Sequence, residues 1–499
     1  MNSTLVAHIL LIGYIFLVFI TFIFGVKKRG RKLFIAFLYF LAISYSVSQG
    51  LYYASTHGGE SPDESAHISY IYYLESTGKI IPDFEDMGMF SNTIMKWSED
   101  YYAYDATEIN NLCHPPLYYN IMRLAGDCFF DTEDPAVIQI NKIRLRLFSL
   151  LIYTIGLFLL LYIGWSRINK SKPWLHLLYC TAATSIPMLG FEMCAVTNDS
   201  LALVTSCICI IGLIRFSEGR RNYLTYLLIN IGITASLLTK LTAALLCIIM
   251  ALIMLVYKMI IERSVKKSLP FEFWVSAPLL LIAFAYFAIT YKHYGTIQPS
   301  LELVSSTDYF QSTIYYTAPE DRVQLTPKEY LNYYINRFFL SWSGIEGLNS
   351  YKKLSIFSKA SLPSELLWIF PIMILLPRVR TITKSIPLPV FSGWVACVIT
   401  FIIQLKSAYG TYLTRGYLGG CQARYYLPFL FAFAMGAVFL FQSLLIDNGF
   451  DSDTELITIR DAKTYGRKLL YNHMIYFMAL IYSFLLFYGN FPFFLIHFT

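Results

Sequence analysis

Carboxylates and an imidazole stand close together in the polar stretch that follows the second apolar segment of the chain. Ser61, Pro62 and Glu64 are typical of a helix start, because Ser suits the N-cap, Pro suits the first turn and Glu64 completes a capping box. His67 follows Asp63 by one helical turn, on the same face. Asp63 and Glu64 therefore either only stabilise the helix N-terminus or present a general base to an acceptor hydroxyl.

A second motif in the same stretch reads His114-Pro115-Pro116-Leu117-Tyr118-Tyr119. The prolines fix the start of another helix, in which Leu117, Ile121 and Leu124 recur at helical spacing. This pattern fits an amphipathic helix in the membrane interface and, equally, a short helix packed on the bundle. His67 and His114 bind acceptor or metal, or only pack. Aromatic residues there either stack on sugar faces or form an interfacial belt: Tyr70, Tyr73, Tyr118 and Tyr119.

Further charged and polar residues fall near the ends of apolar segments that we expect to lie on the same side of a membrane. Each has a simple explanation as a snorkelling anchor, a helix N-cap or a turn residue. Together they place cations where a phosphate would be held. Glu192 lies near the same level. The residues are Arg144, Arg146, Asn198, Asp199, Lys240 and Arg424.

The elements that position these residues are long apolar segments. The 499 residues are 56% hydrophobic and only 14% charged, against roughly 25% charged in soluble domains. The sequence predicts one all-α polytopic membrane domain over residues 1–499, a bundle of about 12 helices with short interfacial helices in its first outer loop. The expected spans are 6–26, 33–54, 147–164, 173–193, 199–215, 222–239, 241–257, 273–291, 361–377, 387–405, 425–445 and 470–488.

Lys and Arg concentrate in short loops that alternate along the chain, which predicts that these loops are cytoplasmic. The N-terminus and two long loops, 55–146 and 292–360, then lie on the outer side of the cell membrane. The net charge of +7 thus reflects topology, and we expect no nucleic-acid partner. Cys113 and Cys128 share the first outer loop, and their pairing in a disulfide is left open.

Five motifs occur in a fixed order along the chain: Pro62-Asp63-Glu64-x-x-His67, His114-Pro115-Pro116-Leu117-Tyr118-Tyr119, Thr197-Asn198-Asp199-Ser200-Leu201-Ala202, Leu238-Thr239-Lys240-Leu241-Thr242 and Gln422-Ala423-Arg424-Tyr425-Tyr426-Leu427-Pro428. The ordered set resembles a family of bacterial multi-spanning membrane proteins that is similar to the glycosyltransferase-C superfamily, and the resemblance runs from about residue 33 to 445. That superfamily includes protein O-mannosyltransferases and aminoarabinose transferases. Its members usually carry one span before the acidic motif, whereas this chain has two.

The resemblance implies a polyprenyl-phosphate-linked sugar as donor, a glycan, lipid or protein acceptor, and an acidic base that matches Asp63, with Glu64 as its neighbour. Some members use a divalent metal, but no metal-ligand set stands out in this sequence. The expected activity is inverting sugar transfer on the outer face. The alternatives are a transporter or polymerase of lipid-linked saccharides, of which a transporter would show charges in mid-span and paired broken helices, and a non-catalytic membrane scaffold.

Overall fold

A computed structural model describes most of the chain, and all statements below concern this part. The described residues are 3–27, 29–56, 63–96, 100–192, 195–343, 362–375, 387–446 and 459–489. The predicted N-cap Ser61 lies outside these residues. Arg378, Arg380 and Lys384, which belong to a short basic loop of the kind expected to be cytoplasmic, lie outside them as well.

Within the described ranges, nine helical segments are long and apolar enough to cross a membrane. They arise from α1 Ser3–Val26, α2 Arg31–Thr56, α5 Lys142–Arg167, α8 Asp199–Ser217, α10 Leu241–Glu262, α12 Phe271–Ser276 continued by η3 Ala277–Leu279 and α13 Leu280–Tyr294, α20 Pro387–Arg415, η7 Ala423–Phe429 with α21 Leu430–Leu444, and α22 Ile459–Gly489.

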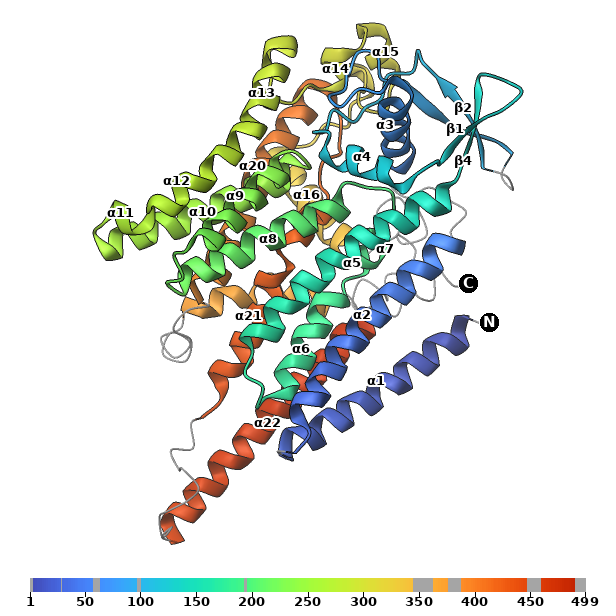
Figure 1. The fold of residues 1–499 in the computed structure, drawn as a ribbon. Coiled ribbons are helices and arrows are strands. Elements are labelled where there is room, and N and C mark those ends of the chain that lie inside the picture. Colours follow the sequence, from blue (N-terminus) through green and yellow to red (C-terminus); the bar gives the residue numbers. More distant parts are fainter. Residues whose placement is uncertain are drawn as a thin grey trace.

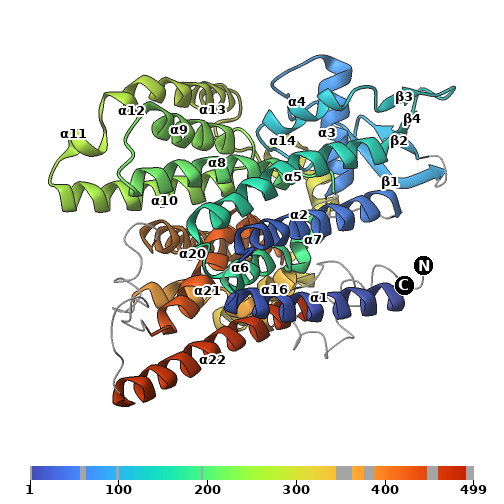
Figure 2. The same cartoon turned by 60° about the horizontal axis from the view of Figure 1, so that its bottom comes forward.

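The helices form a slanted bundle whose layers are visible in Figures 1 and 2. Helix α8 packs between α5 and α9 Tyr223–Leu237. The approach of α8 and α9 is close because Gly232 lacks a side chain: a Cβ there would lie 2.5 Å from the backbone nitrogen of Cys209. Small residues permit such helix contacts in membrane proteins. Helices α1 and α22 lie side by side along one edge of the bundle.

Three of the twelve expected spans differ from long, continuous helices. Segment 173–193 is broken into α6 Pro173–Thr184 and α7 Pro187–Glu192, because Pro187 lacks the N–H that would continue the helix. Segment 222–239 is the shorter helix α9, and 361–377 contains only α18 Leu362–Leu366 and η6 Phe370–Leu375. The bundle of membrane-length helices is confirmed, whereas the number twelve is not.

The first outer loop folds into a compact layer on one end of the bundle, which we call the loop end (Figure 1). It contains α3 Glu64–Thr77, α4 Leu117–Met122 and η2 Arg123–Ala125. Of the two possibilities for the second motif, the structure favours a packed helix, since Tyr118, Tyr119 and Met122 are buried. The backbone N–H of Leu117 donates to the carbonyl of Leu238, which ties α4 to the turn after α9.

The same loop also contains a small antiparallel sheet that we did not predict. Its strands are β1 Met89–Lys96, β2 Tyr101–Asp105, β3 Phe129–Asp131 and β4 Val137–Ile140, in the order β1-β2-β4-β3. Tyr102 pairs with Ile138 across β2 and β4, and both side chains are buried with Phe90 and Ile140. The loop is therefore a mixed layer and not only a set of interfacial helices.

The described part of the second outer loop, 292–343, begins with short helices at the loop end, α14 Leu301–Val304, α15 Thr307–Ser312 and η4 Pro319–Asp321. It ends with the longer helix α16 Pro327–Ser343, which packs against α7, α18 and η7. The remaining short element, α11 Val265–Ser268, lies at the opposite end.

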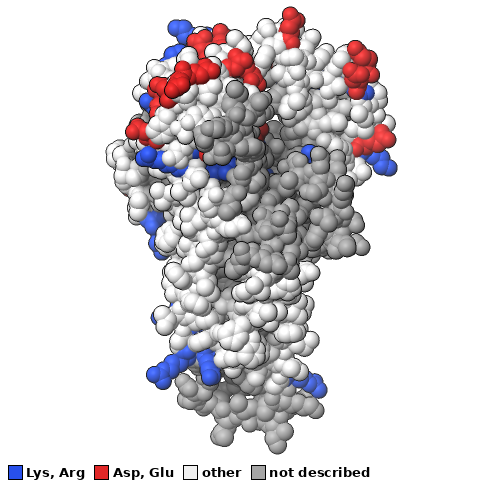
Figure 3. Space-filling view, turned by 90° about the vertical axis from the view of Figure 1, so that its right-hand side faces the viewer, with Lys and Arg blue, Asp and Glu red and all other residues white. Residues whose placement is uncertain are grey.

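Charges divide between the two ends of the molecule. Figure 3 shows Asp and Glu gathered over the loop end together with some Lys and Arg, then a nearly uncharged middle zone, and Lys and Arg without Asp or Glu at the opposite end. The middle zone has the apolar surface that a bilayer requires.

Candidate active site

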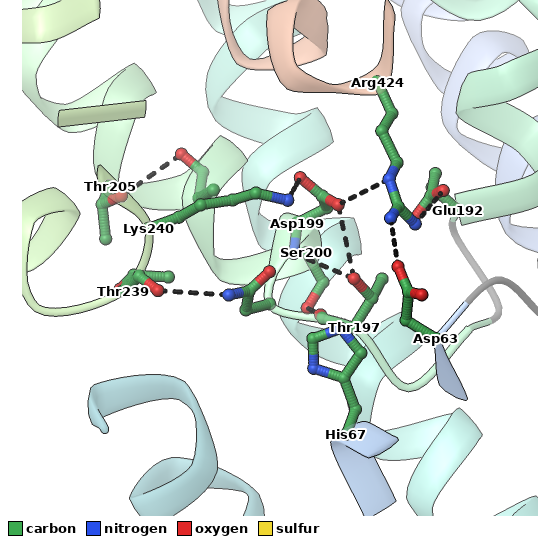
Figure 4. A network of polar contacts seen from close by, with 12 residues as sticks. Asp63, His67, Glu192, Thr197, Asp199, Ser200, Thr205, Thr239, Lys240 and Arg424 are labelled. Atoms are coloured by element: carbon green, nitrogen blue, oxygen red, sulfur yellow. Dashed lines mark hydrogen bonds and ion pairs between the residues drawn. The ribbon is translucent and has the colours of Figure 1, made fainter. Parts of the chain in front are cut away.

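Five charged side chains from distant parts of the chain meet at the loop end of the bundle, and we call them the ionic cluster: Asp63, Glu192, Asp199, Lys240 and Arg424 (Figure 4). They come from the start of α3, the end of α7, the start of α8, the turn before α10, and the start of η7. The cluster therefore depends on the whole bundle.

Arg424 is the centre of the ionic cluster. Its Nη2 lies 2.5 Å from Asp63 Oδ2, its Nη1 lies 3.3 Å from Glu192 Oε1, and its Nε lies 3.9 Å from Asp199 Oδ2. The Arg424 side chain is only 6% exposed. One guanidinium thus holds three carboxylates together, as its planar fork of donors permits.

Lys240 pairs with the other oxygen of Asp199, at 2.6 Å from Nζ to Oδ1. The turn that carries it is tight, because the Lys240 N–H donates to the carbonyl of Ser236 between α9 and α10. The Lys240 ammonium also lies 4.9 Å from the ring centre of Tyr425, a cation–π contact. Both cations of the cluster are therefore engaged by neighbouring groups.

Asp63 occupies the N-cap position of α3 without capping it. Its backbone is left-handed, with φ 62°, and its side chain makes no capping hydrogen bond. Asp tolerates this conformation better than most residues, but such backbones are found most often at functional sites. Burial raises the pKa of Asp63, yet the charge and hydrogen bond of Arg424 outweigh it, so the pKa lies below the usual 3.8. Asp63 is therefore ionised at neutral pH.

Glu64, the residue after Asp63, forms a separate buried pair with Arg146. Two hydrogen bonds join them, Nε to Oε1 at 2.8 Å and Nη2 to Oε2 at 2.5 Å, and the N–H of Val196 donates to Glu64 as well. The side chains are at most 2% exposed. The structure contradicts the capping-box interpretation of Glu64, since its carboxylate contacts α5 and the segment before α8.

Arg144 and Arg146, two residues apart, point to different surroundings. The exposed Arg144 donates a hydrogen bond to the backbone carbonyl of Asp127 in the first outer loop. It makes no described contact with the ionic cluster. Asn198, by contrast, lies beside the cluster and donates to the carbonyl of Thr239, which links the starts of α8 and α10.

The two histidines lie under the cluster among tyrosines. His67 Nδ1 is 3.0 Å from the Tyr119 hydroxyl, and its ring lies 6.2 Å from that of His114. Tyr118 donates to Ser149. Burial and the charge of Lys240 lower the pKa of His114 to about 4, and burial holds the pKa of His67 well below 6.5. Both imidazoles are neutral at pH 7 and add no positive charge.

Glu192 was not among our predicted site residues. A carboxylate at the end of an apolar segment is costly in a membrane and points to a functional or structural role. Within the described part of the chain, Glu192 Oε2 has no hydrogen-bond partner, although the side chain is only 2% exposed. His114 Nδ1 and Asn198 Oδ1 lack partners there as well. Buried polar atoms without partners are costly, and the loop end holds several of them.

Metal-binding geometry occurs elsewhere in the loop layer. Among the described residues, one group of carboxylate and imidazole ligands lies within 4.8 Å: Asp83, Glu85 and His293. Asp83 also accepts a hydrogen bond from Tyr294. The carboxylates of the ionic cluster belong to no such group and are held by cations instead. Cys113 and Cys128 are both free and buried, so the structure shows no disulfide between them.

Together, the fold and the site define a multi-pass helical membrane protein with a buried charged centre at one end. A family described as "Predicted membrane protein (DUF2142)" matches residues 58–433, and the chain belongs to that family. No curated protein matches the sequence.

Solved structures with partial similarity include ArnT from Cupriavidus metallidurans in the apo state, 10% identical with a TM-score of 0.44, covering 92% of this chain and 75% of that one. The same protein bound to undecaprenyl phosphate is 11% identical with a TM-score of 0.43, covering 95% and 77%. Arabinosyltransferase EmbB from Mycobacterium smegmatis is 10% identical with a TM-score of 0.40, covering 91% of this chain and 41% of EmbB.

Proposed function

We propose that the protein is a membrane glycosyltransferase that moves a sugar from a polyprenyl-phosphate donor to an acceptor hydroxyl on the outer face of the membrane. One observation carries the proposal: Asp63 is an ionised, partly exposed carboxylate paired with the buried Arg424, and a second buried cation, Lys240, belongs to the same cluster. A base and a phosphate site side by side are what this transfer requires.

The reaction begins when Asp63 takes the proton of the acceptor hydroxyl. The acceptor oxygen attacks the anomeric carbon from the side opposite the phosphate, so the configuration inverts. The bond from carbon to phosphate oxygen breaks, and the polyprenyl phosphate leaves with both bonding electrons. Positive charge develops on the sugar ring, as in glycoside hydrolysis. Arg424 and Lys240 stabilise the departing phosphate.

The residues around this centre fall into two groups. Glu64 and Arg146 are buried together and fix the first turn of α3, on which Asp63 stands. Asn198, His67, His114 and Tyr118 line the adjoining polar region, where neutral donors and acceptors suit sugar hydroxyls. Arg144 belongs to the exposed surface, where a contact with the lipid headgroup of the donor is its proposed role.

The loop end faces outward in this proposal, with the N-terminus on the same side. The distribution of charge supports the orientation, because the described Lys and Arg dominate the opposite end (Figure 3). Arg167, Arg220 and Arg221 lie at that end, near the ends of α5, α8 and the start of α9.

Purified protein in proteoliposomes, supplied with a polyprenyl-phosphate sugar labelled in the sugar and with candidate acceptors, tests this function. Label in a new covalent product, absent from empty liposomes, is the expected result. Intact labelled lipid moved to the other leaflet without product would favour the transporter instead. If no donor and acceptor class gives a labelled product or a movement of the lipid, the result would favour a non-catalytic membrane scaffold.

A further inference from the structure

Every cation of the ionic cluster is already paired, which raises the question of how a phosphate binds there. Lys240 is paired with Asp199, and Arg424 with Asp63, Glu192 and Asp199. Three carboxylates thus face two cations among the described residues, and the neighbouring histidines are neutral. Burial raises the pKa of Glu192 to about 7, but the carboxylates of Asp63 and Asp199 alone already match the two cations in number. A phosphate added to this arrangement would bring uncompensated negative charge into a buried site, which is strongly unfavourable.

One of the three carboxylates is free to leave the cluster at low cost. The Asp63 side chain is 35% exposed, whereas those of Glu192 and Asp199 are 2% and 5% exposed. Removing a carboxylate from a cation is cheap only if water can solvate it. Asp63 alone of the three satisfies this condition, and no capping hydrogen bond holds it to its own helix.

We propose that the phosphate of the donor displaces Asp63 from Arg424, and that this exchange frees the Asp63 carboxylate to accept the proton of the acceptor. The inference rests on the proposed function and adds a regulatory step to it. The phosphodiester of the donor carries one negative charge, as the carboxylate does, so the exchange leaves the charge around Arg424 unchanged.

The surroundings hold the other groups in place while this partner changes. Glu192 and Asp199 keep their contacts with Arg424, and the ring of Tyr425 lies under both cations, 5.9 Å from the guanidinium and 4.9 Å from the ammonium. Asp63 contacts Nη2 of Arg424 alone, so its departure frees that one nitrogen, which donates to a phosphate oxygen as it does to a carboxylate. Glu192 at Nη1 and Asp199 near Nε keep the guanidinium in place for the new anion.

The backbone confines the movement to Asp63 itself. The next residue, Glu64, is fixed by Arg146 and by the N–H of Val196. Asp63 is held in the left-handed region, which costs energy for a residue with a side chain and is found at switch positions. Its release relaxes this conformation without moving α3.

The exchange makes donor binding precede the activation of the acceptor. Without donor, the carboxylate is neutralised by Arg424 and is a weak base. With donor bound, the carboxylate stands free beside the sugar and its basicity rises. The acceptor is therefore activated only when a sugar is present to receive it.

The affinity for a polyprenyl phosphate without sugar, measured on the full chain in nanodiscs, tests the exchange separately from catalysis. In Asp63→Asn the competing anion is gone, and we expect binding to tighten by roughly tenfold, equivalent to ~1.4 kcal/mol. Asn is isosteric and adopts the left-handed conformation as readily as Asp. Glu302→Gln is the matched control, since Glu302 pairs with Arg415 on the surface, and it should bind as the wild type does.

A double-mutant cycle tests whether Arg424 is the cation for which Asp63 and the phosphate compete. Arg424→Lys keeps the charge but loses the fork, and in that background Asp63→Asn should gain much less affinity than in the wild type. Unchanged or weaker binding by Asp63→Asn, or an equal gain in both backgrounds, would overturn the exchange while leaving the glycosyltransferase proposal intact. Tighter binding by Asp63→Asn together with no sugar product from the wild type would support the exchange and reject the proposed function.

Discussion

Charged side chains cluster at both ends of the bundle, but their burial differs. At the loop end, Glu64, Arg146, Glu192 and Arg424 are between 0% and 6% exposed. At the opposite end, Arg220 is 58% exposed, and Arg221 and Glu262 are 20% and 21% exposed. The opposite end can be explained by topology and solvation alone, since exposed pairs are easily formed. The loop end cannot, because burying charges is costly even when they are paired, so their presence there indicates a structural or chemical role.

Arg146→Ala tests this contrast with the largest expected effect. It leaves Glu64 buried without its main partner, and we expect a loss of about 3–5 kcal/mol in the free energy of unfolding. Reversible unfolding in mixed micelles measures the loss. The control Arg220→Ala, at the opposite end, should cost only about 0–1 kcal/mol. Equal losses in the two variants would erase the distinction between the ends.

Glu192→Gln tests the surplus of carboxylates in the ionic cluster. Burial raises the pKa of Glu192 to about 7, so the side chain carries its negative charge above that pH. Removing this charge beside Arg424 should strengthen the binding of polyprenyl phosphate by about tenfold when measured above pH 7. Glu262→Gln, which removes a carboxylate from an Arg pair at the opposite end, serves as the control. If both variants bind like the wild type, the phosphate does not reach Arg424.

The pH dependence of transfer tests the state of Asp63 with a smaller effect. Its pKa is below 3.8 in the free protein because Arg424 favours the ionised form over the opposing effect of burial. The ion pair therefore stabilises the fold above pH 3.8 and is lost as the pH falls through the lower pKa of the folded state.

The acid limb of kcat/KM, which reports the free enzyme, should accordingly lie below pH 3.8. The acid limb of kcat reports the enzyme–substrate complex. It should lie at higher pH, because in the complex the phosphate has replaced Asp63 as the partner of Arg424 and the pKa of Asp63 is no longer lowered. Rate profiles at subsaturating and saturating donor measure both limbs. Coincident limbs would argue that Asp63 keeps its contact with Arg424 throughout.

Much of the site could be predicted because its residues stand at the ends of apolar segments. Alternation of basic loops assigned these ends to one side, and the structure brings Asp63, Asp199, Lys240 and Arg424 together there. Sequence could not separate Arg144 from Arg146, since the two differ only in the helix face that they occupy. It also could not distinguish a capping Glu64 from one that pairs with Arg146, because the partner lies 82 residues away.

The misses in the fold have identifiable causes. Pro187 stands inside an expected span and was the available sign that α6 and α7 are separate. The sheet was missed because three of its four strands are short: β2 has five residues, β3 three and β4 four. Their alternation, as at Ile138 and Ile140, becomes clear only once the strands pair. The thiols of Cys113 and Cys128 are both buried in that layer without bonding.

The most direct test of the account is the turnover of Asp63→Asn with saturating donor and acceptor, compared with Glu302→Gln in the same preparation. Loss of a general base should lower turnover by roughly 10²–10⁴-fold in Asp63→Asn and leave Glu302→Gln near the wild type. Wild-type turnover in Asp63→Asn would contradict the central claim, because the carboxylate beside Arg424 would then take no proton.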